Sequence, residues 1–209
     1  MRVLHARRWQ GVNLVRRDRP AARGQGSGIL TPFLYRQRVR AVLPHLRGSV
    51  LDHGCGVYSL AARVPPEKYV GIDVDEDSLA VARSRHPLHR FANEVPDGAH
   101  YDTVASMAVI EHVPDPAAYL RHLSGFLGRE SRIVLTTPHP RMELVYRLGA
   151  KVRLFSPRAS EEHEHLLDPR ELERCAERAG LRVVHYQTFL GGANQLAVLI
   201  AATLDSPPR

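Results

Sequence analysis

Short apolar runs alternate with amphipathic stretches along most of this chain. The amphipathic stretches carry apolar residues at helical spacing, most clearly from Phe33 to Leu46. The apolar runs are typical of buried β-strands, which we expect at about residues 49–53, 68–73, 88–92, 101–106, 131–137, 181–188 and 195–204. Strands that alternate with helices in this way predict an α/β fold built on one doubly wound sheet.

Capping residues indicate where several helices begin and end. Asp75, Asp115 and Asp168 each precede a predicted helix, and the last two are followed by proline, which fits a first helical turn. Glu171 completes a capping box with Asp168, and Gly180 is a natural end for that helix. Further helices are expected over about residues 31–46, from the end of the first predicted strand to about residue 63, and over about residues 141–152.

A glycine turn follows the first predicted strand. In the run VLDHGCG, Gly54 and Gly56 permit a tight turn and a close approach of the backbone to a ligand. The second strand ends in Asp73, where a carboxylate can accept hydrogen bonds from a ribose. An aspartate there could instead only cap a turn or helix. We interpret the unit as a site for a nucleoside-bearing cofactor at the carboxyl ends of parallel strands.

The dinucleotide-binding pattern needs a third glycine, which this chain lacks. VLDHGCG and VGIDVD resemble instead two motifs of the class I S-adenosylmethionine-dependent methyltransferases. YDTVASMAVIEHVPDP resembles the family's fourth strand and its loop, and LSGFLGRESRIVLTTPHP the helix, turn and fifth strand. The resemblance covers about residues 46–199. It implies a Rossmann-like seven-stranded sheet in the order 3-2-1-4-5-7-6, with the seventh strand antiparallel.

The resemblance also implies how S-adenosylmethionine would be held. Asp73 would bind the ribose, and Asp52 would order the glycine turn and reach the cofactor's ammonium group, often through water. Asn93 would contact the adenine, whereas Met107 could line the pocket or simply fill the core. Tyr58 stands where the family has its third glycine. The complete implied cofactor set is Asp52, Gly54, Cys55, Gly56, Asp73, Val74, Asn93, Ser106 and Met107.

Methyl transfer mainly requires alignment of donor and acceptor, with removal of a proton when the acceptor is a hydroxyl. His112, just after the fourth strand, is the candidate general base, because imidazole titrates near neutrality. It could instead order its loop by hydrogen bonding. The predicted acceptor pocket consists of Glu111, His139, His163 and His165. His163 and His165 could alternatively bind a divalent metal, but their spacing is not that of a common zinc site, so we predict none.

The formal net charge is +7, and arginine supplies almost all of the positive charge. Ten arginines fall within the first forty residues. We expect a basic mobile arm or lid at residues 1–30, a single domain at residues 31–204 with an acceptor-side insertion at residues 139–167, and a disordered tail at residues 205–209. Two distant cysteines, Cys55 and Cys175, imply no disulfide framework. No apolar run is long enough to span a membrane, which favours a cytoplasmic protein.

The sequence therefore predicts an S-adenosylmethionine-dependent methyltransferase with a small-molecule acceptor, and O-methylation is slightly favoured. The basic N-terminal segment keeps open an RNA or protein acceptor, since arginine-rich segments attract nucleic acid. Tyr58 in the glycine motif keeps open a cofactor-binding protein without transferase activity. The sequence does not identify the acceptor or the oligomeric state.

Overall fold

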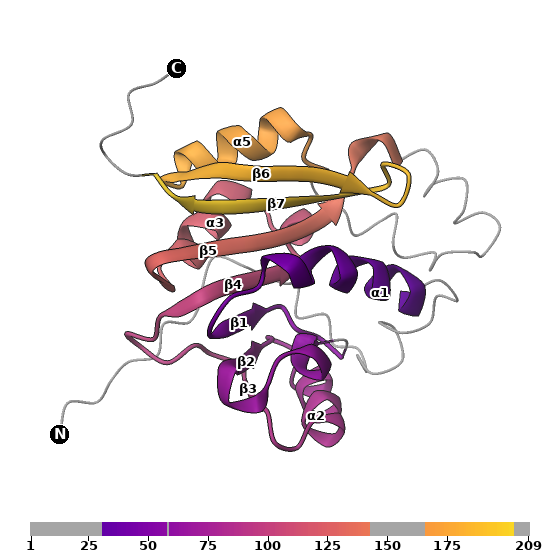
Figure 1. The fold of residues 1–209 in the computed structure, drawn as a ribbon, viewed down its shortest axis with the longest axis vertical. Coiled ribbons are helices and arrows are strands. Elements are labelled where there is room, and N and C mark those ends of the chain that lie inside the picture. The colour runs from indigo at the N-terminus through magenta and orange to yellow at the C-terminus, as the bar shows by residue number, and fades with distance from the viewer. Residues whose placement is uncertain (1–30, 58, 143–165, 203–209) are drawn as a thin grey trace.

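A seven-stranded sheet lies at the centre of the computed structural model, which describes residues 31–57, 59–142 and 166–202 (Figure 1). The strand order is β3-β2-β1-β4-β5-β7-β6, and β7 pairs antiparallel with both β5 and β6. The other neighbouring strands pair in parallel. This order confirms the predicted fold class. The strands are β1 Val50–His53, β2 Tyr69–Ile72, β3 Arg90–Ala92, β4 Tyr101–Met107, β5 Leu127–Pro138, β6 Leu181–Phe189 and β7 Asn194–Ala201.

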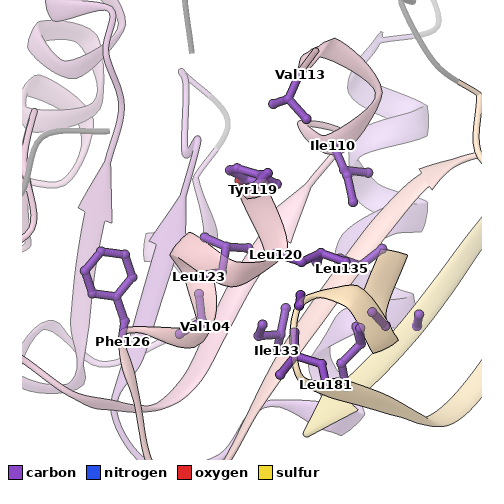
Figure 2. Packing of buried hydrophobic residues seen from close by; sticks show 14 of the residues in the cluster. Val104, Ile110, Val113, Tyr119, Leu120, Leu123, Phe126, Ile133, Leu135 and Leu181 are labelled. Carbon is purple, nitrogen blue, oxygen red and sulfur yellow. The ribbon is translucent and has the colours of Figure 1, made fainter. Parts of the chain in front are cut away.

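Helices cover both faces of the sheet: α1 Thr31–Val42, α2 Glu76–Arg85, α3 Pro116–Ser124 and α5 Pro169–Arg178. Alternate residues of each strand face opposite sides. Val134 and Leu196 pack in one apolar cluster with α1 and α2, which we call the α1 face. Ile133 and Leu135 pack in the other cluster with α3 and α5, which we call the α3 face (Figure 2). Strand parity therefore tells which helices each site residue faces.

The predicted capping residues begin three of these helices. The Asp75 side chain accepts a hydrogen bond from the amide of Ser78, and Asp115 does so from Ala118. Asp168 forms the complete capping box with Glu171. These local interactions confirm the predicted starts of α2, α3 and α5.

One helix prediction was wrong. We expected a helix after the glycine turn up to about residue 63, but the structure has only a 3-10 turn, Leu60–Arg63. Two prolines, Pro65 and Pro66, follow closely, and a residue before proline is disfavoured in helical backbone; Val64 is accordingly extended. Of the helix expected at about residues 141–152, the structure describes only residues 141 and 142. They belong to the 3-10 turn Pro140–Met142.

Several predictions concern residues outside the described ranges. These are the basic arm at residues 1–30, Tyr58, the part of the insertion at residues 143–165 that contains His163 and His165, and the tail at residues 205–209. The parallel pairing of β1, β2, β3, β4 and β5 nevertheless brings their carboxyl ends to one edge of the sheet (Figure 1). That edge carries the residues described next.

Candidate functional site at the carboxyl edge of the sheet

The glycine turn lies directly against the end of β2. The amides of Gly54 and Cys55 both donate to the carbonyl oxygen of Ile72, at 2.8 and 3.0 Å. Gly54 and Gly56 have φ angles of +78° and +54°, which favour glycine. A Cβ atom on Gly54 would lie 2.5 Å from Cγ2 of Val109 in the loop after β4. Glycine is therefore needed here both for the backbone angle and for the close approach of the two loops.

Asp73 connects the glycine turn to the loop after β2. Its Oδ2 accepts from the amide of Gly56 at 2.7 Å, and its Oδ1 accepts from the amide of Asp75 at 2.9 Å. Burial raises the pKa of Asp73, and backbone hydrogen bonds from Asp75, Gly56 and Val74 oppose that rise. A carboxylate has about four lone-pair sites, so the group keeps the capacity for a further donor. Asp73 can thus brace the turn and still bind a hydroxyl group.

Asp52 is a buried carboxylate that is only half satisfied. It is 1% exposed, and its Oδ2 accepts from the amide of Leu60 and the hydroxyl of Tyr69, both at 2.8 Å. Its Oδ1 is buried and has no hydrogen-bond partner among the described residues. Burial raises the pKa of Asp52 to about 6. An unpartnered buried carboxylate oxygen is costly, so this atom is suited to a cation or a donor from a ligand.

Three more residues of the implied cofactor set lie in this turn or just after β2 and β3. Cys55 is buried, and burial raises the pKa of its thiol, so it stays protonated as a packing residue. Val74, after β2, is 63% exposed, and Asn93, after β3, is also exposed. Val74 and Asn93 therefore offer one apolar and one polar contact at the ends of neighbouring strands, as a nucleobase with polar edges would require.

The last two residues of β4 face opposite sides of the sheet. Ser106 is buried on the α3 face, where its hydroxyl lies 2.9 Å from that of Tyr119. Tyr119 in turn lies 3.0 Å from Nδ1 of His53. Met107 packs half-buried against the cluster on the α1 face. The network of Ser106, Tyr119 and His53 was not foreseen from the sequence, because it depends on how α3 docks.

The loop after β4 carries the candidate general base. Ala108 has a φ of 56°, which is unusual for a residue with a side chain, and its amide donates to the carbonyl of Thr136 at 2.8 Å. The 3-10 turn Ile110–His112 follows. Glu111 is 1% exposed and accepts from the hydroxyl of Thr137 at 3.0 Å, so its carboxylate points into the protein beside β5. His112 is half-buried at the end of the turn.

The described ends of the predicted insertion are tied to the same edge. Gln195 donates to the carbonyls of Pro138 and Leu167, at 3.2 and 2.6 Å, and accepts from the hydroxyl of Tyr186. His139 is buried, and burial, aided by the charge of Arg141, lowers its pKa. The insertion therefore leaves and rejoins the sheet beside the loops that carry the candidate site.

Three polar residues on the α1 face at this edge were also missed. Thr136 and Asn194 are fully buried, and Arg38 of α1 donates from Nε to Oδ1 of Asn194 at 3.2 Å. Thr136 and Asn194 could have been noticed in the sequence as polar residues at the ends of otherwise apolar strands. Nothing in the sequence indicated that Arg38 of α1 would join them.

The part of the chain that the structure describes contains no group of three or more side chains suited to a metal ion. It also contains no helix long and apolar enough to cross a membrane.

A family model described as "Methyltransferase domain" matches residues 27–186. Among curated proteins, the ubiquinone biosynthesis O-methyltransferase of Aeromonas salmonicida is 32% identical over 160 residues, covering 66% of this chain and 66% of that protein. The protein of the same name from Neisseria meningitidis serogroup C is 34% identical over 156 residues, with the same two coverages. That from Bordetella bronchiseptica is 32% identical over 149 residues and is covered over 61% of its length. The chain thus spans just under two thirds of these relatives.

Solved structures share the fold at low identity. A magnesium protoporphyrin IX methyltransferase from Synechocystis, solved with bound S-adenosylhomocysteine (SAH), has a TM-score of 0.61 at 18% identity. The match covers 81% of this chain and 82% of that one. A possible histamine N-methyltransferase from Thermotoga maritima has a TM-score of 0.62 at 17% identity, covering 82% and 90%. At these identities the likeness concerns the fold alone.

Proposed function

The chain belongs to the methyltransferase domain family, and from this premise we propose that it is an S-adenosylmethionine-dependent methyltransferase acting on a hydroxyl group of a small molecule. The observation that carries the proposal is the carboxyl edge of β1 and β2, where a half-satisfied buried carboxylate lies under a glycine turn braced by Asp73. The similarity to ubiquinone biosynthesis O-methyltransferases supports oxygen as the accepting atom.

The residues present fit the cofactor. Asp73 would accept hydrogen bonds from the ribose hydroxyls through its remaining lone pairs. The unpartnered Oδ1 of Asp52 would face the ammonium group, directly or through water, and the exposed Val74 would lie against the adenine. When bound, the cofactor supplies an electrophilic methyl group on a positively charged sulfur.

The chain's own residues would orient the acceptor, exclude water and take up a proton. We propose His112 as the base, because it ends the 3-10 turn that follows β4, at the edge that carries the cofactor residues. Glu111 was expected in the acceptor pocket, but its buried carboxylate accepts from Thr137, so we propose that it holds the loop in place instead. The insertion at residues 139–167, with His163 and His165, would complete the acceptor pocket, and the basic segment at residues 1–30 would cover it.

Two measurements test this function. Calorimetry should show that S-adenosylmethionine and S-adenosylhomocysteine (SAH) bind the purified protein. Transfer of a labelled methyl group should then be measured to a panel of hydroxylated small molecules, with RNA and unrelated proteins as competing acceptors. Absence of cofactor binding would contradict the proposal. Binding followed by transfer only to RNA or protein would replace the small-molecule acceptor with the alternative that the arginine-rich N-terminal segment suggests.

A further inference from the structure

Among the buried polar atoms that have no partner in the described part of the chain, two lie close together on the α1 face of β5 and β7. They are Nδ2 of Asn194, at the first residue of β7, and Oγ1 of Thr136 in β5. Both residues are 0% exposed. A buried polar group without a hydrogen bond costs about 1–3 kcal/mol, and such groups in folded proteins usually mark a water or a ligand that completes the site. The two atoms therefore point to an occupant.

Strand register places the two residues next to each other. Thr136 pairs with Leu196 and Pro138 pairs with Asn194, so Thr136 and Asn194 are diagonal neighbours on adjacent strands. Both have the parity of Val134 and Leu196, which pack on the α1 face. Met107, which ends β4, is paired with Thr136 and faces the same side. The two unpartnered groups thus lie one and two strands from the end of β4.

Arg38 adds a cation to this pair. Its Nε donates to Oδ1 of Asn194, which fixes the amide so that the Nδ2 donor points elsewhere. Within residues 31–57, 59–142 and 166–202, Arg38 has no other hydrogen bond and no ion pair. Two terminal guanidinium nitrogens of a half-buried arginine therefore remain available as donors.

The available groups are mainly donors. They comprise the guanidinium of Arg38, the amide of Asn194 and the hydroxyl of Thr136, and only the hydroxyl can also accept. A planar guanidinium matches a carboxylate with two parallel hydrogen bonds, and such charge-assisted bonds are about twice as strong as neutral ones. We propose that Arg38, Asn194 and Thr136 form a subsite for a carboxylate group of the methyl acceptor. This inference rests on the proposed function and specifies its acceptor as a hydroxy acid.

The test compares acids with their neutral amides on the SAH-loaded protein. Calorimetry measures the affinity for salicylate against salicylamide, mandelate against mandelamide and lactate against lactamide. At least one acid should bind about tenfold more tightly than its amide, as expected for one charge-assisted pair. Arg38→Gln should remove this preference, whereas Arg36→Gln, which removes the same charge from an exposed position of α1, should keep it.

A second variant tests recognition of the acid while keeping the hydrogen bond between Arg38 and residue 194. Asn194→Asp retains the acceptor for Nε of Arg38 and supplies a carboxylate in the subsite itself, so it should also abolish the preference for acids. SAH affinity should be unchanged in all three variants, because none of these side chains belongs to the glycine turn or the ends of β2 and β3. Equal affinity for every acid and its amide, no binding of any acid, or an unchanged preference in Arg38→Gln would overturn the subsite while leaving the proposed function intact. If SAH does not bind the wild-type protein, both proposals fail.

Discussion

Asp73 combines two tasks in one side chain, since it braces the glycine turn and should also bind the ribose. Replacing it with alanine removes charge-assisted hydrogen bonds to the ribose hydroxyls, so we expect SAH affinity to fall by about 1–3 kcal/mol. Asp77→Ala is the matched control, because Asp77 is an exposed acid in the first turn of α2. Calorimetry measures both affinities. Unchanged affinity in Asp73→Ala would remove this residue from the site.

The buried carboxylate of Asp52 should make stability depend on pH. Its folded-state pKa of about 6 lies above its ordinary value of 3.8. The contribution of this group to the free energy of unfolding is therefore fully present below pH 3.8 and is lost as pH rises through about 6. Asp52→Asn lacks this titration, so its stability relative to wild type should increase between pH 4 and pH 7 by up to about 3 kcal/mol.

Urea unfolding of both proteins at several pH values measures the difference. The pKa of His53 is lowered by burial and by the charge of His122. Because His53 titrates in both proteins, its effect cancels in this comparison. A stability difference that stays constant across this range would show that Asp52 does not titrate as described. A cationic group bound at its free oxygen should favour the charged carboxylate, so SAH affinity should rise with pH in wild type but not in Asp52→Asn.

His112 is the residue to test for proton removal. His112→Ala should lower turnover strongly and leave SAH affinity nearly unchanged, because a base acts in the chemical step and not in cofactor binding. General bases typically contribute about 10²–10⁴-fold to the rate. The measurement is kcat with the acceptor that the panel identifies, alongside calorimetry with SAH. Retention of full turnover would assign the base to another residue, or to water.

At the scale of elements, the glycine turn is the part of the site where a small change should matter most. Gly54→Ala combines left-handed backbone strain with a clash against Val109, and together these should cost about 2–5 kcal/mol of stability. Gly98→Ala is the control, because Gly98 has a similar φ of +72° and open space around it. It should lose only about 1–2 kcal/mol.

A double-mutant cycle checks that the close approach of the two loops is the cause. Adding Val109→Ala to Gly54→Ala removes the clashing methyl groups, so the double variant should be more stable than the sum of the two single changes predicts. Denaturant unfolding gives the four free energies. Strict additivity would mean that Val109 is not what requires glycine at this position.

The elements also show what sequence reasoning can reach. The starts of α2, α3 and α5 were predicted correctly because Asp75, Asp115 and Asp168 act on amides only three residues away. The strand order followed from the family resemblance. The helix expected before residue 63 failed because a local apolar pattern was outweighed by the prolines that follow. Local interactions were therefore accessible, and boundaries set by competing signals were not.

Contacts between distant elements lay beyond the sequence. Asp52 and Asp73 could be placed because Asp52 lies near the end of β1 and Asp73 directly follows β2. The partners of Asp52, Tyr69 and the amide of Leu60, could not, since they depend on how the turn packs on β2. The bond from Arg38 to Asn194 joins residues 156 positions apart and exists only because α1 crosses the sheet. The positions of the candidate cofactor residues along the strands were thus predictable in outline, and contacts between distant elements were not.

At the scale of the whole molecule, the basic segment before α1 can be tested as a unit. We propose that the segment at residues 1–30 covers the acceptor when it is bound, in the way that a lid excludes water from a reaction, and deleting residues 1–27 removes most of it. Every described side chain assigned to the cofactor lies between residues 52 and 107, so deleting residues 1–27 should leave SAH affinity unchanged. Turnover of the small acceptor should fall about tenfold or more if closure is required.

The deletion also separates the proposed lid from a nucleic-acid function. The full chain and the deleted chain should be compared for turnover of the small molecule and for RNA binding at several salt concentrations. A lid predicts lost turnover in the deleted chain, whatever happens to RNA binding. Intact turnover combined with the loss of a salt-dependent RNA affinity would contradict the lid, because arginines that neutralise phosphates weaken their hold as salt rises. In that case the seven arginines within residues 1–27 would serve a second partner and not the methyl acceptor.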